Sequence, residues 1–496
     1  MNIRLVSRSI GILLLLLAAA MTACFCVGSI LPAGEGHSSA SAHKGWGLAI
    51  AITLAGGGAL YFFGRGTGRD RILRKDAIGI VGLSWFVCGL FAALPYFLCE
   101  PSLPASEAFF EGVSGLTTTG ATVITDLAAL PKTVLLWRSL TQWLGGMGIL
   151  AMFVLVLSSL GASGLSMFRA ETSAHGQDLS GATLRNMARW LWMLYITLTL
   201  ICCLGMWALG MTPFQAINHA MTTVATGGFS TEDASFSAEG FGIALKLWTI
   251  LFMFLCGISL PLYIALIRKR SLHLLRQHEE TWVYIGLIVS FSVIAIAKRI
   301  YSNNFTAPWV EESVDTIFNV VSIMTSTGFA TGDYNLWPPA AKGILLFAMV
   351  IGGCAGSTAG GLKVSRIILC VRMLRIEVAR MYRPNKVAIL KLNGHPIPAG
   401  AQGQTFVVLC AGAGLMAFSG YLMLAFEPNH SADGCLSAVI SCLTNIGPAF
   451  KEFGPTQNYA GLTHGSKIML PLLMIVGRLE YLAVIALFSK NLWRRF

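Results

Sequence analysis

The sequence predicts an all-α integral membrane protein with two N-terminal helices followed by four parallel helix–loop–helix repeats. Three observations support this fold class. Hydrophobic residues make up 55% of the 496 positions and charged residues 12%, about half the charged fraction of a soluble domain. Apolar runs long enough to cross a ~30 Å hydrocarbon core recur along the whole chain. A Thr/Gly-rich turn also returns four times at a similar spacing.

The N-terminal region, residues 1–76, is predicted to form two transmembrane helices. Arg4 and Arg8 precede an apolar run, and Met21-Thr22-Ala23-Cys24 resembles a lipoprotein cleavage site, so a signal peptide is the alternative. Apolar character continues to about residue 31, however, and that length spans a bilayer. A second apolar run covers 47–63. We therefore expect a retained first helix.

The remainder divides into four repeats with the same order of segments: 77–165, 166–270, 271–392 and 393–496. The first long helices are expected near 77–99, 187–211, 280–300 and 402–427, and the second near 133–160, 241–268, 340–375 and 465–489. The apolar stretch between each pair is too short to span. Each such stretch must therefore enter and leave by one face, and non-helical backbone survives at that depth only when it is buried or lines a water-filled path.

The charge pattern gives the expected orientation. The net charge is +12, and the basic residues lie in connections between apolar runs, at 65–75, 268–276, 363–391 and 493–496. The alternate connections carry carboxylates: Glu100, Glu107, Glu111, Glu232, Asp233, Glu239, Glu311, Glu312, Asp315, Glu427 and Asp433. By the positive-inside rule, we expect a multi-pass protein of the cytoplasmic membrane with both termini in the cytoplasm. This distribution excludes a nucleic-acid partner.

The four turns carry the functional signal. They read Thr-Thr-Thr-Gly-Ala at 117–121, Val-Ala-Thr-Gly-Gly at 224–228, Thr-Ser-Thr-Gly-Phe at 325–329 and Thr-Asn-Ile-Gly-Pro at 444–448. We align them on Gly120, Gly227, Gly328 and Gly447, which are 107, 101 and 119 residues apart. Six positions before these glycines stand Ser114, Met221, Ser322 and Ser441.

A ring of backbone carbonyls can replace the hydration shell of a cation. Glycine adopts the dihedrals that inward-pointing carbonyls require, and the C-terminal end of a short helix favours a cation. Capped helix ends in ordinary loops would explain one copy, but four copies favour a central ion pore. The predicted cation-binding residues are Thr118, Thr119, Gly120, Ala225, Thr226, Gly227, Ser326, Thr327, Gly328, Asn445, Ile446 and Gly447.

These turns, together with three further segments, resemble the Trk/Ktr/HKT superfamily of potassium transporters. The segments are Trp-Arg-Ser-Leu-Thr-Gln-Trp-Leu-Gly-Gly-Met-Gly at 137–148, Gly-Gly-Cys-Ala-Gly-Ser-Thr-Ala-Gly-Gly-Leu-Lys at 352–363 and Gly-Arg-Leu-Glu at 477–480. The two additional N-terminal helices favour the TrkH/TrkG type of potassium uptake subunit over the KtrB type. The resemblance implies potassium as the transported ion, a loose filter, a homodimer and a cytoplasmic nucleotide-binding regulatory subunit of TrkA type. Because all four filter glycines are present, potassium is favoured over sodium.

Residues 352–361, the glycine-rich loop, interrupt the second helix of the third repeat because Gly, Ser and Thr hold a membrane helix poorly. The resemblance implies a mobile barrier beneath the filter; a packed kink is the alternative. A phosphate cradle is disfavoured because Val364 follows Lys363. The predicted gate residues are Gly352, Gly353, Ala355, Gly356, Ser357, Gly360, Gly361, Lys363 and Arg478.

Arg478 lies inside an apolar segment, where a charge should face the protein interior or water. We expect it to donate to carbonyls of the glycine-rich loop and to oppose passive permeation; a tether between helices is the alternative. Glu480 is two positions away, on another helical face, and is a poor partner for it. Arg138 and Gln142 are one turn apart near the outer face, and we interpret both as structural.

Two other classes of protein fit less well. A membrane enzyme would need paired carboxylates or a histidine cluster at membrane depth, and the nine histidines do not cluster. A carrier with a midplane site would show inverted repeats, whereas these repeats are parallel. We therefore expect no enzymatic activity and no cofactor of its own. Channel-like flux and coupling to protons or sodium both remain open, as does the nucleotide that governs the partner.

Overall fold

The computed structural model describes residues 1–30, 39–66, 73–159, 181–238, 240–271, 273–305, 308–385 and 389–493. The predicted repeat boundary at 165/166 lies outside these residues, as do the predicted charged positions Arg69, Arg71, Glu239 and Lys386. The described chain is mostly helical. Its strands are β1 (Lys391–Leu392) and β2 (His395–Pro396), which form an antiparallel hairpin.

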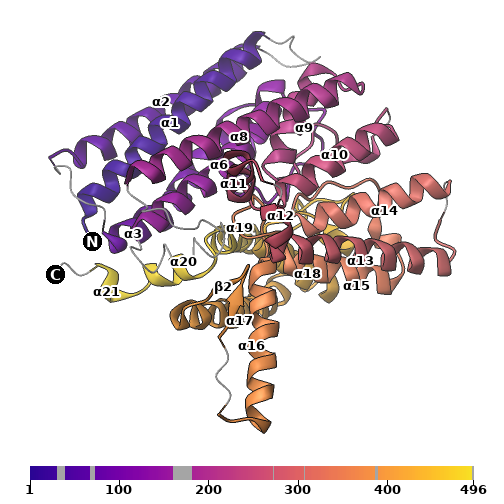
Figure 1. Ribbon diagram of the computed structural model, residues 1–496. Coiled ribbons are helices and arrows are strands. Elements are labelled where there is room, and N and C mark those ends of the chain that lie inside the picture. Colours follow the sequence, from indigo (N-terminus) through magenta and orange to yellow (C-terminus); the bar gives the residue numbers. More distant parts are fainter. Residues whose placement is uncertain are drawn as a thin grey trace.

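The two predicted N-terminal helices are present as α1 (Ile3–Ile30) and α2 (Ser39–Phe63). They lie side by side along one edge of the molecule (Figure 1). Glycine lets them approach closely, because a Cβ atom at Gly11 would lie 2.6 Å from the backbone nitrogen of Tyr61. The pair is fixed to the body through α1, where the Cys24 thiol donates to Thr133 O at 3.3 Å.

Each of the four repeats contains a long first helix, a short helix and a second helix. The first helices are α3 (Arg74–Ala92) extended by α4 (Leu94–Leu98), α8 (Gly181–Ala208), α13 (Glu279–Tyr301) and α17 (Ala399–Phe426). The short helices are α5 (Ala105–Leu116), α9 (Pro213–Val224), α14 (Trp309–Met324) and α18 (Ala432–Thr444). These positions match the predicted segments, and the fold class is confirmed.

The second helices are α6 (Lys132–Ser159), α10 (Ile243–Cys256) with α11 (Leu260–Lys269), α15 (Pro339–Ile351) with α16 (Val364–Tyr382), and α19 (His464–Arg478) with α20 (Leu482–Leu487). The short helices α12 (His273–Gln277) and α21 (Lys490–Trp493) follow repeats two and four. Within the described residues, six helices are long and apolar enough to cross a membrane, and α10 with α11 would make a seventh.

The prediction of continuous second helices in repeats two and four was wrong. Helices α10 and α11 are bent by 85° at the break between them. Pro261 lies in the first turn of α11, a position that suits the start of a new helix. In repeat four, Glu480 and Tyr481 adopt positive φ of 54° and 64°, which ends α19. The interruption expected in repeat three is present between Ile351 and Val364.

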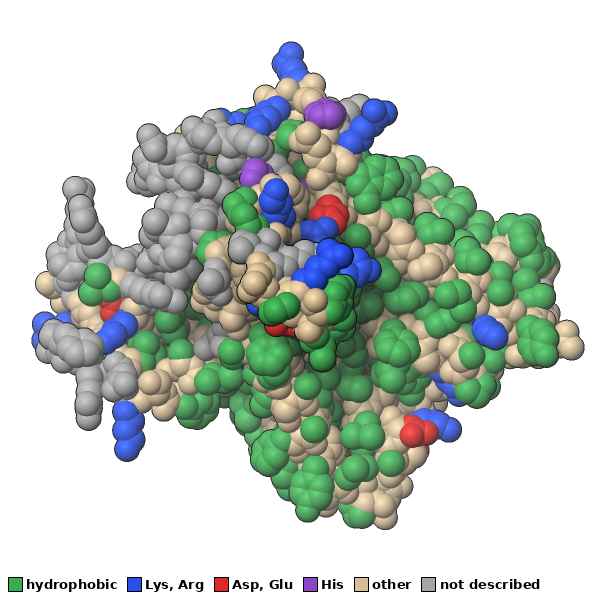
Figure 2. All heavy atoms as spheres, turned by 60° about the horizontal axis from the view of Figure 1, so that its bottom comes forward, with side chains coloured by type: hydrophobic (Ala, Val, Ile, Leu, Met, Phe, Trp, Pro, Cys, Tyr) green, Lys and Arg blue, Asp and Glu red, His purple; other side chains and the backbone are tan. Residues whose placement is uncertain are grey.

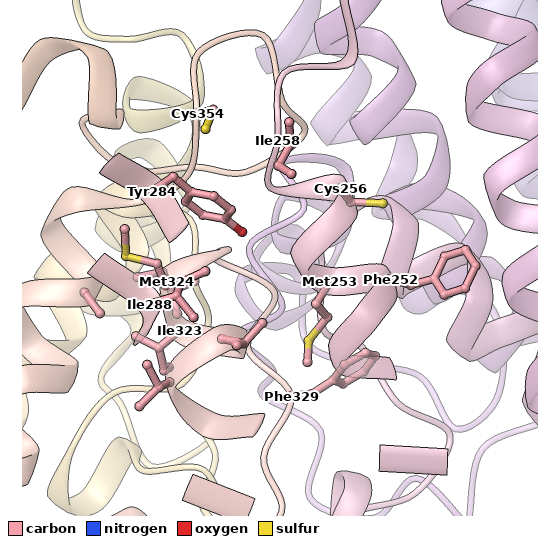
Figure 3. Packing of buried hydrophobic residues seen from close by; sticks show 14 of the residues in the cluster. Phe252, Met253, Cys256, Ile258, Tyr284, Ile288, Ile323, Met324, Phe329 and Cys354 are labelled. Carbon is pink, nitrogen blue, oxygen red and sulfur yellow. The ribbon is translucent and has the colours of Figure 1, made fainter. Parts of the chain in front are cut away.

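The surface and the core both fit a protein that lies in lipid. Hydrophobic side chains cover much of the lower and right-hand parts of the face in Figure 2. Figure 3 shows one core cluster, in which Tyr284 of α13 lies between Met324 of α14 and Cys354 of the glycine-rich loop. The Tyr284 ring stacks on Phe254, with centroids 5.5 Å apart, and its hydroxyl donates to Phe254 O. Repeats two and three are therefore joined beneath the ends of their short helices.

Candidate ion filter and glycine-rich loop

The four turns that follow the short helices share one backbone geometry. In each turn a residue with a side chain adopts the left-handed region, and a glycine two positions later also has positive φ. The first set is Thr118, Thr226, Ser326 and Asn445, with φ of 53°, 53°, 52° and 56°. The second set is Gly120, Gly228, Gly328 and Gly447, with φ of 84°, 79°, 86° and 101°.

This geometry corrects the predicted alignment of the second turn by one residue. Gly228, and not Gly227, corresponds to the other three glycines, so Ala225 takes the place of Thr117 and not of Thr118. Hydrogen bonds agree, because the N–H groups of Thr119, Gly227, Thr327 and Ile446 donate to the carbonyls of Ser114, Thr222, Ser322 and Ser441 at 2.8–3.0 Å. A sequence signal was available: a hydroxyl residue stands six positions before every glycine once Gly228 is used.

The four turns meet in a closed ring, formed by residues 118–120, 226–228, 326–328 and 445–447 (the four-turn ring). Each glycine lies against a carbonyl of the next repeat, and the fourth closes on the first. A Cβ atom placed on Gly120 would lie 2.2 Å from Gly227 O, and one placed on Gly228 would lie 2.0 Å from Thr327 O. A Cβ atom placed on Gly328 would lie 2.1 Å from Ile446 O, and one placed on Gly447 would lie 2.6 Å from Thr119 O. Since real Cβ atoms essentially never come within 3.0 Å, only glycine fits these positions.

Two side chains outside the turns donate to carbonyls of the ring. The Gln142 amide donates from Nε2 to Gly227 O at 2.6 Å and accepts from Phe229 N at 3.1 Å. The Tyr459 hydroxyl donates to Gly447 O at 2.8 Å. Gln142 also occupies the space beside Gly227, where a Cβ atom would lie 2.4 Å from its Cδ. Sequence reasoning missed both contacts, since neither residue is near its partner in the chain.

Behind the first turn, a buried ion pair joins the short helix to α6. Arg138 Nε donates to Glu111 Oε1 at 2.8 Å, and both side chains are almost fully buried. Glu111 also accepts from Thr122 Oγ1 and from Val123 N, while Arg138 Nη1 donates to Ser230 O in the second repeat. With these bonds satisfied, the pair holds two turns in fixed positions. The structural interpretation of Arg138 therefore has a definite basis.

The glycine-rich loop lies against the ends of three short helices and their turns. Thr358 Oγ1 donates to Val224 O at 3.2 Å, at the end of α9. Gly361 N donates to Thr444 O at 3.1 Å, at the end of α18, and Gly360 N donates to the Ser326 hydroxyl of the third turn. Gly352, Gly356 and Gly361 adopt positive φ of 75°, 73° and 80°, as does Lys363 at 74°. The loop thus borders the helix-side end of the four-turn ring.

The break between α10 and α11 in repeat two also contacts the glycine-rich loop. Cys354 N donates to Gly257 O at 2.9 Å, and Leu260 N donates to Gly356 O at 3.1 Å, so the α10–α11 break receives the loop. Ser357 and Ala359 are buried here, and Gly353 sits where a Cβ atom would lie 2.7 Å from Ala359 Cβ.

The predicted gate cations Lys363 and Arg478 both donate to carbonyls of the loop. Lys363 Nζ donates to Ala359 O, and Arg478 Nη1 donates to Thr358 O at 3.0 Å. Arg478 is 5% exposed, and its Nε and Nη2 atoms have no hydrogen-bond partner among the described residues. Glu480 pairs with Arg366 instead, as its different helical face predicts. Both cations are therefore buried against the loop.

The oxygen atoms available in this region are backbone carbonyls and hydroxyls. Within the described part of the chain, no group of three or more His, Cys, Asp or Glu side chains is placed to hold a metal ion. The ring instead contains four equivalent backbone carbonyls and no fixed charge. Such an arrangement suits a monovalent cation that binds and leaves quickly.

Comparisons with known proteins identify the family of this chain. The TrkH family model, described as "Cation transport protein", matches residues 47–495. The Trk system potassium uptake protein TrkH of Halomonas elongata is 34% identical, and that of Escherichia coli K12 is 33% identical, each over all of both chains. The crystal structure of the potassium transporter TrkH from Vibrio parahaemolyticus has 29% sequence identity and a TM-score of 0.87 over all of both chains. The chain therefore belongs to the TrkH family of cation transport proteins, a family of multi-pass membrane transporters and not of enzymes.

Proposed function

We propose that this chain takes up potassium ions across the cytoplasmic membrane, with the four-turn ring as its selectivity filter. The observation that carries the proposal is the closed cycle of glycine–carbonyl contacts. Four carbonyls of equivalent residues take part in this cycle. Carbonyls arranged as a ring can replace the hydration shell of a potassium ion. The relatives named above are potassium uptake proteins, which supports potassium as the ion. In this proposal the second turn contributes Thr226, Gly227 and Gly228.

The glycine-rich loop is the barrier of this path. Its hydrogen bonds to Val224, Ser326 and Thr444 put it next to three of the four turns, on the side where the short helices end. A cation that leaves the ring on that side meets this loop and the Arg478 guanidinium. A buried positive charge repels a permeating cation, and more strongly than it would in water. Opening therefore requires the loop, Arg478 or both to move.

Assembly and orientation complete the proposal. Both termini lie in the cytoplasm, because the basic connections, which include the Arg372 and Arg380 region of α16, belong on that side. As the resemblance implies, the chain forms a homodimer and works with a cytoplasmic nucleotide-binding subunit of TrkA type. Helix α16 begins directly after the glycine-rich loop and projects from the body (Figure 1), which gives such a subunit a route to the barrier.

The first test is complementation of a potassium-uptake-deficient strain on low potassium. Growth with the intact chain is expected, and no growth despite verified membrane insertion would refute potassium uptake. The second test removes residues 355–357 from the glycine-rich loop. Passive potassium flux per inserted molecule in liposomes should rise without any partner subunit, and Arg478→Ala should raise it less because the loop keeps its bulk. If both variants insert normally and conduct no more than the parent, the loop is only a packed kink.

A further inference from the structure

One buried carboxylate near the glycine-rich loop has no role in the filter or the barrier described so far. Glu280, in the first turn of α13, is 1% exposed. Its Oε1 atom accepts two backbone hydrogen bonds, from Ala355 N at 2.7 Å and from Ser365 N at 3.0 Å. Ala355 is in the middle of the loop, and Ser365 is in the first turn of α16. A single oxygen atom therefore joins two segments that are ten positions apart.

The segment between these two contacts has an unusual backbone geometry. Gly361 and Lys363 both adopt positive φ, and α16 begins at the next residue, Val364. One backbone bond, from Val364 N to Gly353 O at 3.0 Å, already links the start of α16 to the loop, and Glu280 adds two bonds from a third element. A carboxylate suits this contact, because the N-terminus of a helix attracts negative charge. Hydrogen bonds to an ionised acceptor are also roughly twice as strong as neutral ones.

We propose that Glu280 is a positioning residue that locks the glycine-rich loop to the start of α16, so that displacement of α16 is transmitted to the loop. The proposal rests on the proposed barrier function of the loop. In this proposal α13 stays in place, and the Glu280 carboxylate holds the glycine-rich loop and the start of α16 together; we call this contact the clamp.

The clamp is also connected to the β1–β2 hairpin. The Asn393 side chain, at the hairpin turn, accepts from Glu280 N at 3.5 Å. Arg372 of α16 donates to Lys391 O of β1 and pairs with Glu279, so the hairpin, α16 and the start of α13 meet at one place. A partner that displaces α16 or the hairpin would therefore act on Glu280 directly.

The experiment uses the intact chain in proteoliposomes and its native thiols. Cys354 is fully buried in the glycine-rich loop next to Ala355, and Cys202 is fully buried in α8, far along the chain from the clamp. A membrane-impermeant thiol reagent is added to permeabilised vesicles, and peptide mass spectrometry measures modification at each cysteine. The variants are Glu280→Gln, which keeps the size of the side chain, and Glu280→Ala. Glu377→Gln is the matched control, since it removes the same charge from an exposed side chain that pairs with Arg380 of its own helix.

Glu280→Gln should raise the rate of Cys354 modification about tenfold, because two charge-assisted hydrogen bonds become neutral ones. Glu280→Ala should raise it further, while the rate at Cys354 in Glu377→Gln and the rate at Cys202 in every variant should stay near the parent values. An unchanged rate at Cys354 in both Glu280 variants would overturn the proposal, and so would a parallel rise at Cys202, which would show a general loosening.

Flux measurements on the same vesicles separate this inference from the barrier proposal. A rise in passive potassium flux together with Cys354 modification supports both. A rise in modification without flux supports the clamp and refutes the barrier. If the deletion of 355–357 raises flux but the Glu280 variants change neither readout, the barrier stands and the clamp is refuted.

Discussion

Replacing Gly328 with serine tests the filter most directly. A Cβ atom at this position would lie 2.1 Å from Ile446 O, so the two groups must separate by about 0.9 Å to reach the 3.0 Å at which real Cβ contacts begin. The residue also has φ of 86°, and holding a residue with a side chain in a sparsely populated region costs about 1–3 kcal/mol. The strain falls on the carbonyls of two neighbouring repeats at once. Since 1.4 kcal/mol is a factor of ten, we expect the preference for potassium over sodium to fall about tenfold.

The assay compares potassium and sodium flux into proteoliposomes that contain equal amounts of correctly inserted protein. Gly332→Ser is the matched control, because Gly332 lies four residues on in the same chain segment and a Cβ atom there meets nothing within 4 Å. Gly120→Ser, in the first turn, should behave like Gly328→Ser, since its Cβ atom would lie 2.2 Å from Gly227 O. Ion ratios that stay at the parent value in both ring variants would refute the assignment of the four turns as the filter.

Two further predictions concern the second turn and the orientation. Gly227→Thr alone should lower flux because its side chain collides with Gln142. Gln142→Ala alone should lower it less, because Gly227 O loses its donor. The double variant should recover from the Gly227→Thr value to about the Gln142→Ala value, because the collision is removed but the donor is still missing. Flux per inserted molecule measures this, and a double variant that is worse than both single ones would contradict the reciprocal fit. A reporter fused after Arg380 should be cytoplasmic, and one inserted near residue 37, outside the described residues, should be external. Protease or reporter accessibility measures the side of the membrane, and the opposite result at both positions would invert the topology.

Much of the architecture could be predicted because its signals are local. The apolar runs fix the long helices by length alone, and the Thr/Gly turns mark the ends of α5, α14 and α18. The second turn shows where this reasoning stops. Val-Ala-Thr-Gly-Gly offers two adjacent glycines, and only contacts from elsewhere decide between them. Position 227 has no room for a side chain because Gln142 fills that space, whereas Gly228 is the residue whose φ matches the other turns.

The missed helix breaks have a similar cause. Gly257 ends α10 where a Cβ atom would lie 2.2 Å from the Tyr284 hydroxyl, so a helix of the third repeat occupies the space beside it. At the end of α19, two residues with ordinary side chains take positive φ, and nothing in the local sequence indicates it. Both breaks are tertiary effects that override an apolar pattern typical of a continuous helix. The interruption at 352–361 was predictable because its glycines are numerous enough to weaken a helix by themselves.

The contrast between the ring and the loop suggests why one chain carries four unlike repeats. The ring repeats its backbone angles almost identically. The proposed filter requires this, since a cation is bound equally from four sides only when four carbonyls are equivalent. The loop occurs once, and its contacts are unequal: it donates to repeats two, three and four, whereas the Thr118 hydroxyl of repeat one has no partner among the described residues. Four identical subunits would have to build four such loops or none. Repeats in one chain can diverge, so the third can supply the proposed barrier and the fourth Arg478, while the backbone geometry of the proposed filter is kept in all four.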